Sequence, residues 1–338
     1  MEGGRYSSGT FVGLALGSGS LSVAVRGPGS SKPATQAVSV DDPSPKAVAQ
    51  KAMDLARSLI AQHHLDPVIA AVAGGIPGHI NFTTGRVIYG YDLVAFRKPW
   101  LDVPFPELLS DTFESPAVVD NDVNCMAMYQ HAFGHARRVR SFVTIYIVPE
   151  LNGLGAGIMI DSRIHRGAAG GAGELGHIVV QPGGPRCHCG NRGCLQAVLG
   201  NETLVRDVNW GERQRVNNVR DAAELAERRD ERASQAFSQA GRYFGQALST
   251  IVNLLNPPLI IIGGPEEYLG PRARLSSAEG TGRGRPPRSA RLFQDGYRDT
   301  LATDSFLDLD QTCRIVTTYL GLDMAAVGAS LLAADAGS

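Results

Sequence analysis

The residues with the clearest chemical potential are three cysteines and one histidine near the middle of the chain. Cys187, Cys189 and Cys194 have the spacing C-x-C-x4-C, and His177 lies ten residues before the first of them. Three thiolates and one imidazole form a closed tetrahedral ligand set for Zn²⁺, which is the pattern of a structural site. The alternatives are unrelated free thiols and disulfides, and the odd total of five cysteines disfavours disulfides. The spacing therefore predicts a structural zinc site.

The segment around His177 also carries a family motif. Gly173-Glu-Leu-Gly-His177, followed by C-x-C-G-x-x-G-C, resembles the signature of the ROK family, named for its repressors, open reading frames and kinases. The resemblance covers nearly the whole chain, from about residue 11 to 336. It implies an α/β protein with the actin-like ATPase (ribonuclease H-like) fold, in which two lobes flank a sugar-binding cleft.

The resemblance implies roles for an Asp-Asn-Asp triplet. Asp120-Asn121-Asp122-Val123-Asn124 resembles the family's E-N-D-A-N segment, so Asp122 matches the catalytic base of the kinases and Asn121 matches a residue that binds sugar hydroxyls. Phosphoryl transfer to a hydroxyl needs a carboxylate within hydrogen-bond reach of it. Without the resemblance, such a triplet would equally fit a turn or a helix N-cap.

Three further residues match sugar contacts of the family. Glu174 and His177 belong to the G-E-x-G-H segment, and His177 would bind zinc through one ring nitrogen and offer the other to the sugar. The alternative for Glu174 is a solvated loop carboxylate. The family usually carries Glu two residues after the last cysteine, where this chain has Gln196. An amide still hydrogen-bonds a hydroxyl but brings no charge.

Two segments resemble parts of the family's ATP site, which consists of two glycine-rich hairpins and a Gly-Gly pair near the adenosine. Glycines let backbone N–H groups approach phosphates closely. Gly153-Leu-Gly155-Ala-Gly157 resembles the second hairpin, although Asn152 stands where the family usually has Thr. Gly263-Gly264 resembles the adenosine segment, but a Gly pair after a strand can also be a simple turn.

The first hairpin departs most from the kinase pattern, which reads roughly G-x-D-x-G-G-T. This chain reads Gly13-Leu-Ala15-Leu-Gly17-Ser-Gly19-Ser, so Ala15 stands where the acid that supports Mg²⁺ would be. Losing a charged partner at a reacting metal costs on the order of several kcal/mol. The pattern L-x-L-G-x-G-x-L resembles instead the sugar-responsive repressors of the family.

The composition is that of an ordinary globular protein. The chain has 338 residues, of which 43% are hydrophobic and 19% charged, and a net charge of −1. This length allows two domains, and the charge gives no support to a nucleic-acid-binding domain. No apolar run approaches a membrane span, and the first residues lack the features of a signal peptide. We therefore expect a cytoplasmic protein, where thiolates stay reduced for metal binding.

Hydrophobic periodicity and turn residues predict alternating strands and helices. Strands are predicted at 12–16, 21–25, 68–73 (ending at Gly74-Gly75), 117–119, 142–148, 158–160 and 259–262, and helices at 43–64, 123–133, most of 221–255, and 324–334.

From this pattern and the resemblance we predict an N-terminal lobe of 11–118 plus 323–336 and a C-terminal lobe of 119–322. An Arg-rich segment, 268–292, is predicted to be a disordered surface loop, with a nucleic-acid or phosphate contact as the alternative.

Together these observations favour a zinc-containing, sugar-sensing protein of the transcriptional-regulator type with a degenerate ATP site. The alternative is an ATP- and Mg²⁺-dependent hexose or N-acetylhexosamine kinase with Asp122 as general base, and a third possibility is an oligomerising scaffold. Expected partners are a sugar or sugar phosphate and further copies of the chain. Direct DNA binding is not expected from this chain alone, because no helix-turn-helix pattern fits the residues before Phe11.

Overall fold

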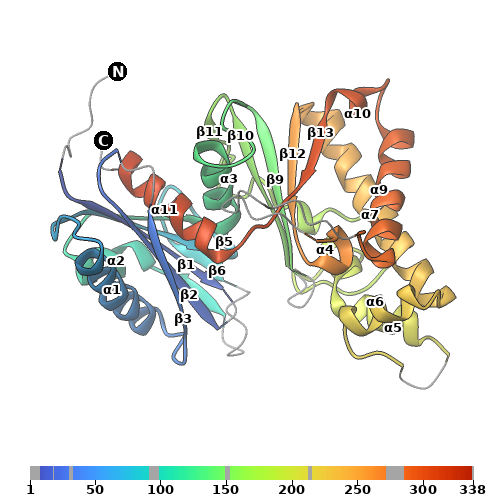
Figure 1. Ribbon diagram of the computed structural model, residues 1–338, viewed down its shortest axis with the longest axis horizontal. Coiled ribbons are helices and arrows are strands. Elements are labelled where there is room, and N and C mark those ends of the chain that lie inside the picture. The colour runs from blue at the N-terminus through green and yellow to red at the C-terminus, as the bar shows by residue number, and fades with distance from the viewer. Residues whose placement is uncertain are drawn as a thin grey trace. The chain divides into compact units, whose positions relative to one another are not determined.

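The chain folds into two compact units, each built from strands and helices (Figure 1). The computed structural model describes residues 8–17, 19–29, 33–90, 99–148, 153–211, 215–271 and 285–336. The first unit consists of Met1–Arg140, Gly157–Ala172 and Leu320–Ser338, and the second of Ser141–Ala156 and Gly173–Tyr319. Among the described residues, no helix combines the length and apolar character needed to cross a membrane.

The first unit contains a five-stranded sheet with the order β3-β2-β1-β4-β8. Strands β1, β2 and β3 are antiparallel neighbours, while β4 and β8 continue the sheet parallel to β1. Their bounds are Thr10–Gly17 (β1), Ser20–Arg26 (β2), Ala34–Ser39 (β3), Ile69–Ile76 (β4) and Ala117–Asn121 (β8). A small antiparallel sheet is formed by His79–Ile80 (β5), Val87–Gly90 (β6) and Trp100–Val103 (β7).

Helices cover both faces of this sheet. On one face, Val12, Leu14 and Leu16 of β1 join a core with α1 (Pro45–Gln62) and α2 (Phe105–Phe113). On the other face, α11 (Leu322–Ala336) packs on β1 and β4 and against α3 (Asp122–Ala132). Because side chains along a strand alternate between the two faces, positions 13 and 15 of β1 lie on the face covered by α11.

Packing of α3 against α11 explains why the first unit is larger than the lobe that we predicted. It includes 119–140 and 157–172, which we had assigned to the C-terminal lobe. Strand β4 is also longer than predicted. The pair Gly74-Gly75 does not end it, because both residues lie in the parallel ladders with β1 and β8.

The second five-stranded sheet has the order β11-β10-β9-β12-β13. Strands β9, β12 and β13 are parallel, and β10 and β11 form an antiparallel pair. Their bounds are Phe142–Val148 (β9), Gly153–Ile160 (β10), Arg163–Ile164 (β11), Leu259–Gly263 (β12) and Arg314–Thr317 (β13).

The helices of the second unit pack largely on α7, the longest described helix. Their bounds are Leu195–Leu199 (α4), Asn201–Asn209 (α5), Val219–Glu227 (α6), Glu231–Leu255 (α7), Glu266–Leu269 (α8), Arg288–Asp304 (α9) and Leu309–Thr312 (α10), with a 3₁₀ turn at Leu175–His177 (η3). Helix α7 pairs with α9 through stacked aromatic side chains, such as Phe244 on Phe293.

The prediction of a disordered loop over 268–292 is wrong at both ends. Helix α8 extends to Leu269, and α9 begins at Arg288. The Arg-rich composition suggested disorder, but the segment from Arg288 forms an amphipathic helix. Its Ser289, Ala290 and Phe293 side chains are buried against the second unit. Residues 272–284 lie outside the described residues.

Candidate metal centre and binding residues

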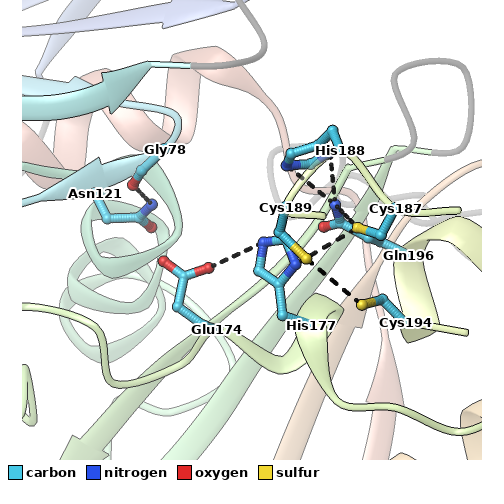
Figure 2. Close-up of polar contacts among 9 residues, drawn as sticks. All are labelled: Gly78, Asn121, Glu174, His177, Cys187, His188, Cys189, Cys194 and Gln196. Atoms are coloured by element: carbon cyan, nitrogen blue, oxygen red, sulfur yellow. Dashed lines mark hydrogen bonds and ion pairs between the residues drawn. The ribbon is translucent and has the colours of Figure 1, made fainter. Parts of the chain in front are cut away.

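The four predicted zinc ligands lie together in the second unit (Figure 2). The ligand atoms of His177, Cys187, Cys189 and Cys194 all lie within 4.8 Å of one another. The Cys189 and Cys194 Sγ atoms are 3.7 Å apart, as are Cys187 Sγ and His177 Nδ1. A tetrahedral Zn²⁺ with Zn–S bonds of about 2.3 Å would hold two sulfurs about 3.8 Å apart. The donor set therefore fits a tetrahedral metal ion.

A short loop and two helical elements place these ligands. His177 ends the η3 turn, and Cys194 immediately precedes α4. In the loop between them, the backbone carbonyl oxygen of Cys187 accepts a hydrogen bond from the Gly190 N–H. Gly190 and Gly193 have φ of +95° and +76°, a conformation that favours glycine, and they turn the loop back toward His177.

The thiols differ in their surroundings. Cys187 and Cys194 are buried, whereas Cys189 is exposed. Burial raises the pKa of the Cys194 thiol to about 12. The pKa of the Cys189 thiol is lowered overall. Burial alone would raise this pKa, but several hydrogen bonds, first that from the Asn191 backbone, outweigh the effect of burial. A buried thiol with so high a pKa needs a nearby cation to become a thiolate at neutral pH.

His177 uses its two ring nitrogens in different directions. Nδ1 lies beside Cys187, and Nε2 lies 3.8 Å from Glu174 Oε2. Glu174 stands at the start of η3, and its side chain is 42% exposed. A metal on Nδ1 would fix the ring plane, which leaves Nε2 and the Glu174 carboxylate on an accessible side.

Gln196 and His188 lie on the other side of the metal cluster. Gln196 is only 4% exposed, and its Nε2 is 3.5 Å from Cys187 Sγ and 3.1 Å from His188 Nδ1. Burial, followed by the nearby His177, lowers the pKa of His188 to about 4. The sequence analysis did not single out His188, although its position between two zinc-spaced cysteines was a signal.

Asn121 and Asp122 belong to the first unit, at the junction of β8 and α3. The Asn121 side chain caps α3, because its Oδ1 accepts from the backbone N–H groups of Val123 and Asn124 at 2.8 and 3.4 Å. Its Nδ2 donates to Gly78 O at 3.0 Å (Figure 2). Asp122 is the first residue of α3 and is 8% exposed.

Asp120 is a structural residue that the sequence analysis did not interpret. It is 2% exposed, and its Oδ1 accepts from Asn121 N and Asn124 Nδ2 at 2.7 and 2.8 Å. Its Oδ2 binds Arg166, whose guanidinium lies over the Phe82 ring with 3.8 Å between Cζ and the ring centroid.

The first hairpin of the predicted ATP site is closely packed. Ala15 is fully buried. A Cβ built on Gly17 would lie 2.6 Å from Leu322 Cδ1, and one on Gly13 would lie 2.0 Å from the Ala326 carbonyl oxygen of α11. The α11 backbone therefore accounts for glycine at position 13, whereas a side chain at position 17 would meet only the flexible end of Leu322. Gly19 is the turn residue, with φ of +68°.

The other glycines of the predicted ATP site lie in or beside strands. Gly153 and Gly155 begin β10, which starts five residues earlier than the predicted strand, and Asn152 lies outside the described residues. Gly263 ends β12, and Gly264 follows it. The residues next in the chain line a cavity of about 440 Å³ in the second unit, formed by Asn201, Asn218, Val219, Arg220 and Pro265–Glu267.

Comparison with known proteins settles the family. A sequence model of the ROK family matches residues 11–266, most of the chain. The chain belongs to the ROK family. Among curated relatives, the DNA-binding transcriptional dual regulator NagC of Escherichia coli is 30% identical over 207 residues, which cover 58% of this chain and 48% of NagC. The chain spans about half the length of this and other curated repressors that it matches.

Solved ROK structures confirm the actin-like ATPase fold. The ROK hexokinase from Thermus thermophilus has a TM-score of 0.73 and 25% identity, covering 96% of this chain and 97% of that chain. A ROK transcriptional regulator described as a homologue of the E. coli MLC protein has a TM-score of 0.74 and 24% identity, covering 97% and 79%. The family therefore includes both regulators and kinases among the relatives of this chain.

Proposed function

We propose that this chain is a zinc-containing, sugar-sensing ROK protein of the transcriptional-regulator type, which binds a sugar or sugar phosphate as effector. Zn²⁺, held by His177 and the three cysteines, would act as a structural ion that orders the loop and orients the His177 ring. Nε2 of His177 and the carboxylate of Glu174 would then present one donor and one acceptor to adjacent sugar hydroxyls.

Asn121 and Asp122 of the first unit are proposed separately as sugar contacts, from the resemblance of their segment to that of the family. Asn121 Oδ1 accepts from two backbone N–H groups, and one N–H of its Nδ2 donates to Gly78 O. The second N–H of Nδ2 would donate to a sugar hydroxyl. Asp122, fixed as the first residue of α3, would accept a hydrogen bond from a sugar hydroxyl. In a sensor it would not act as the general base of a phosphoryl transfer. Regulators named for N-acetylglucosamine and xylose among the relatives support a sugar as the class of effector.

The observation that carries the choice of sensor over kinase is the packing of the first hairpin. Ala15 brings no carboxylate for Mg²⁺, and it is fully buried. Gly13 packs directly against the α11 backbone, so packing alone accounts for this glycine of the hairpin. Enzymatic phosphoryl transfer depends on electrostatic stabilisation by bound Mg²⁺, so loss of its charged support costs orders of magnitude in rate.

The alternative is an ATP-dependent hexose or N-acetylhexosamine kinase with Asp122 as general base. It is favoured by the retained Asp122, Glu174 and His177, and by the cavity that follows Gly264, whose size suits a small ligand. Glu266 and Glu267 line this cavity, and Arg220 lies 3.6 Å from Glu267, so its charge balance does not favour a polyphosphate.

One mass-spectrometric assay separates the two functions. The zinc-loaded protein is incubated with Mg²⁺·ATP and a panel of hexoses and N-acetylhexosamines, with Asp122→Ala as control, and melting temperature is recorded with each sugar. A sensor gives a sugar-dependent rise in melting temperature and no sugar phosphate. A sugar phosphate that disappears in the Asp122→Ala control would overturn the sensor proposal and establish the kinase.

A further inference from the structure

Gln196 connects two parts of the second unit that carry different candidate functions. It lies in α4, two residues after Cys194, and its side chain extends toward Cys187 and His188 (Figure 2). The side chain is almost completely buried, with 4% of the residue exposed. Its polar atoms therefore need partners within the protein.

The amide nitrogen of Gln196 lies within hydrogen-bond distance of the cysteine loop, and the His188 tautomer decides which ring nitrogen accepts from it. Nε2 lies 3.5 Å from Cys187 Sγ and 3.1 Å from His188 Nδ1. The 3.5 Å contact lies within the range of an N–H···S hydrogen bond, and a thiolate is a much better acceptor than a thiol. The amide nitrogen thus serves the cysteine-bearing loop and not a ligand in solvent.

The amide oxygen of Gln196 faces the turn that carries Glu174 and His177. A Cβ built on Gly176, in the middle of this turn, would lie 2.5 Å from Gln196 Oε1. The space beside Gly176 is therefore filled by the Gln196 amide together with the Leu154 carbonyl oxygen, which would lie 2.3 Å from the same Cβ. One side chain thus lies between the η3 turn on one side and the Cys187–Cys189 segment on the other.

We infer that Gln196 is a positioning residue of the metal centre, which donates a hydrogen bond to the Cys187 thiolate and holds the cysteine loop against the η3 turn. This inference rests on the proposed zinc site and departs from our prediction that Gln196 binds sugar. Its effect on a sugar would be indirect, through the placement of His177 and Glu174.

Charge and hydrogen-bond donation distinguish Gln196 from the Glu that the family usually carries at this position. Three thiolates, one neutral imidazole and Zn²⁺ carry a net charge of −1, and a donated N–H stabilises the thiolate that accepts it. A carboxylate at position 196 would face the Cys187 sulfur with like charge and with no hydrogen to donate. It would have to turn away from the sulfur, which would leave Cys187 without this donor.

Two variants of the full chain test the inference, and both keep the side-chain length. Gln196→Met removes the donor without adding charge, and Gln196→Glu removes the donor and adds a negative charge. Gln181→Glu is the matched control, since it makes the same chemical change in the same unit. Zinc affinity is measured by competition with a chromophoric chelator, and Co²⁺ replaces Zn²⁺ to record the thiolate-to-metal charge-transfer band.

We expect zinc affinity to fall by roughly tenfold in Gln196→Met and more in Gln196→Glu, in line with the 10–100-fold effects of residues that support metal ligands. The charge-transfer band should shift in both, and Gln181→Glu should match the wild type. If Gln196→Glu does not fold, Gln196→Met alone decides. Wild-type zinc affinity and an unshifted band in Gln196→Met would overturn the inference.

Sugar binding to the zinc-saturated proteins separates this inference from the proposed function. If the wild-type protein binds zinc but no sugar raises its melting temperature, the sensor proposal is refuted. The order of zinc affinities among the variants would still support the role of Gln196. If instead Gln196→Glu alters sugar affinity and leaves zinc affinity unchanged, Gln196 is a direct sugar ligand, and the positioning role is wrong.

Discussion

Arg166 and Asp120 form a buried ion pair between residues that lie 46 positions apart in the chain. Arg166 Nη2 and Nε lie 2.7 and 2.8 Å from Asp120 Oδ2. The other carboxylate oxygen holds the start of α3 through Asn121 N and Asn124 Nδ2. The pair therefore fixes the segment that carries Asn121 and Asp122 to the residues that follow β11.

Removing the cation from this pair should destabilise the protein strongly. The side chains of Asp120 and Arg166 are 3% and 19% exposed, so Arg166→Met leaves a buried carboxylate without its counter-ion. Breaking a buried pair in this way costs about 3–5 kcal/mol. We expect a correspondingly lower midpoint in urea unfolding followed by circular dichroism.

Arg163→Met is the matched control, because Arg163 lies on β11 with its side chain exposed. It should unfold near the wild-type midpoint. Equal midpoints for Arg163→Met and Arg166→Met would show that the ion pair does not hold this segment.

The proposed zinc site gives a second prediction, which concerns metal content. Cys189→Ser should release most of the metal, lower the melting temperature and weaken sugar binding through His177. Because the second unit has its own core, the stability loss should be well below the roughly 10–16 kcal/mol of zinc peptides that fold only with metal. Metal per protein is measured by plasma mass spectrometry.

Cys313→Ser provides the control, since Cys313 is buried in the same unit but outside the ligand cluster. It should retain full zinc. A Cys189→Ser protein that contains as much zinc as Cys313→Ser and binds sugar normally would refute the metal assignment.

The clustering of the proposed metal ligands could be predicted because most of them are close together in the chain. Cys187, Cys189 and Cys194 lie within one loop, and their spacing alone restricts what they can bind. The partners of Asp120 could not be predicted in the same way, since Arg166 comes from a distant segment and neither residue belongs to a motif with fixed spacing. The burial of Gln196 was missed for the same reason, because it depends on how the loop folds over α4.

Element boundaries show the same limit of local patterns. The hairpin of β1 and β2 was predicted, since apolar runs flank a Gly-Ser turn. The end of β4 was not, because pairing with strands on both sides outweighs the low strand preference of Gly74-Gly75. At Arg288 the composition suggested disorder, yet a few buried side chains are enough to form α9.

Asn121 allows a third prediction, which separates its capping role from its proposed sugar contact. Asn121→Asp keeps an oxygen that accepts from Val123 N and Asn124 N, but it loses the N–H that binds Gly78 O. Asn121→Ala loses both and should cost about 1 kcal/mol of helix capping. We expect Asn121→Asp to be closer to wild type in stability, while both variants bind sugar weakly in calorimetric titration. Wild-type sugar affinity in both variants would leave Asn121 with a structural role alone.

The last prediction tests the proposal that the first hairpin is a degenerate phosphate site, at Ala15, where the kinase pattern has an acid. Ala15 is fully buried, so Ala15→Asp places a carboxyl group where charge is costly, and its folded pKa should rise above the unfolded value of about 3.9. The destabilisation relative to Ala15→Ser should therefore have a part that depends on charge, which is absent below about pH 4 and grows as the pH rises toward the folded pKa, in addition to a pH-independent cost of burying the carboxyl group. Urea midpoints at pH 5 and pH 8 measure this difference. If Ala15→Asp is as stable as Ala15→Ser at pH 8 and phosphorylates a sugar with Mg²⁺·ATP, the hairpin has kept the geometry of a phosphate site.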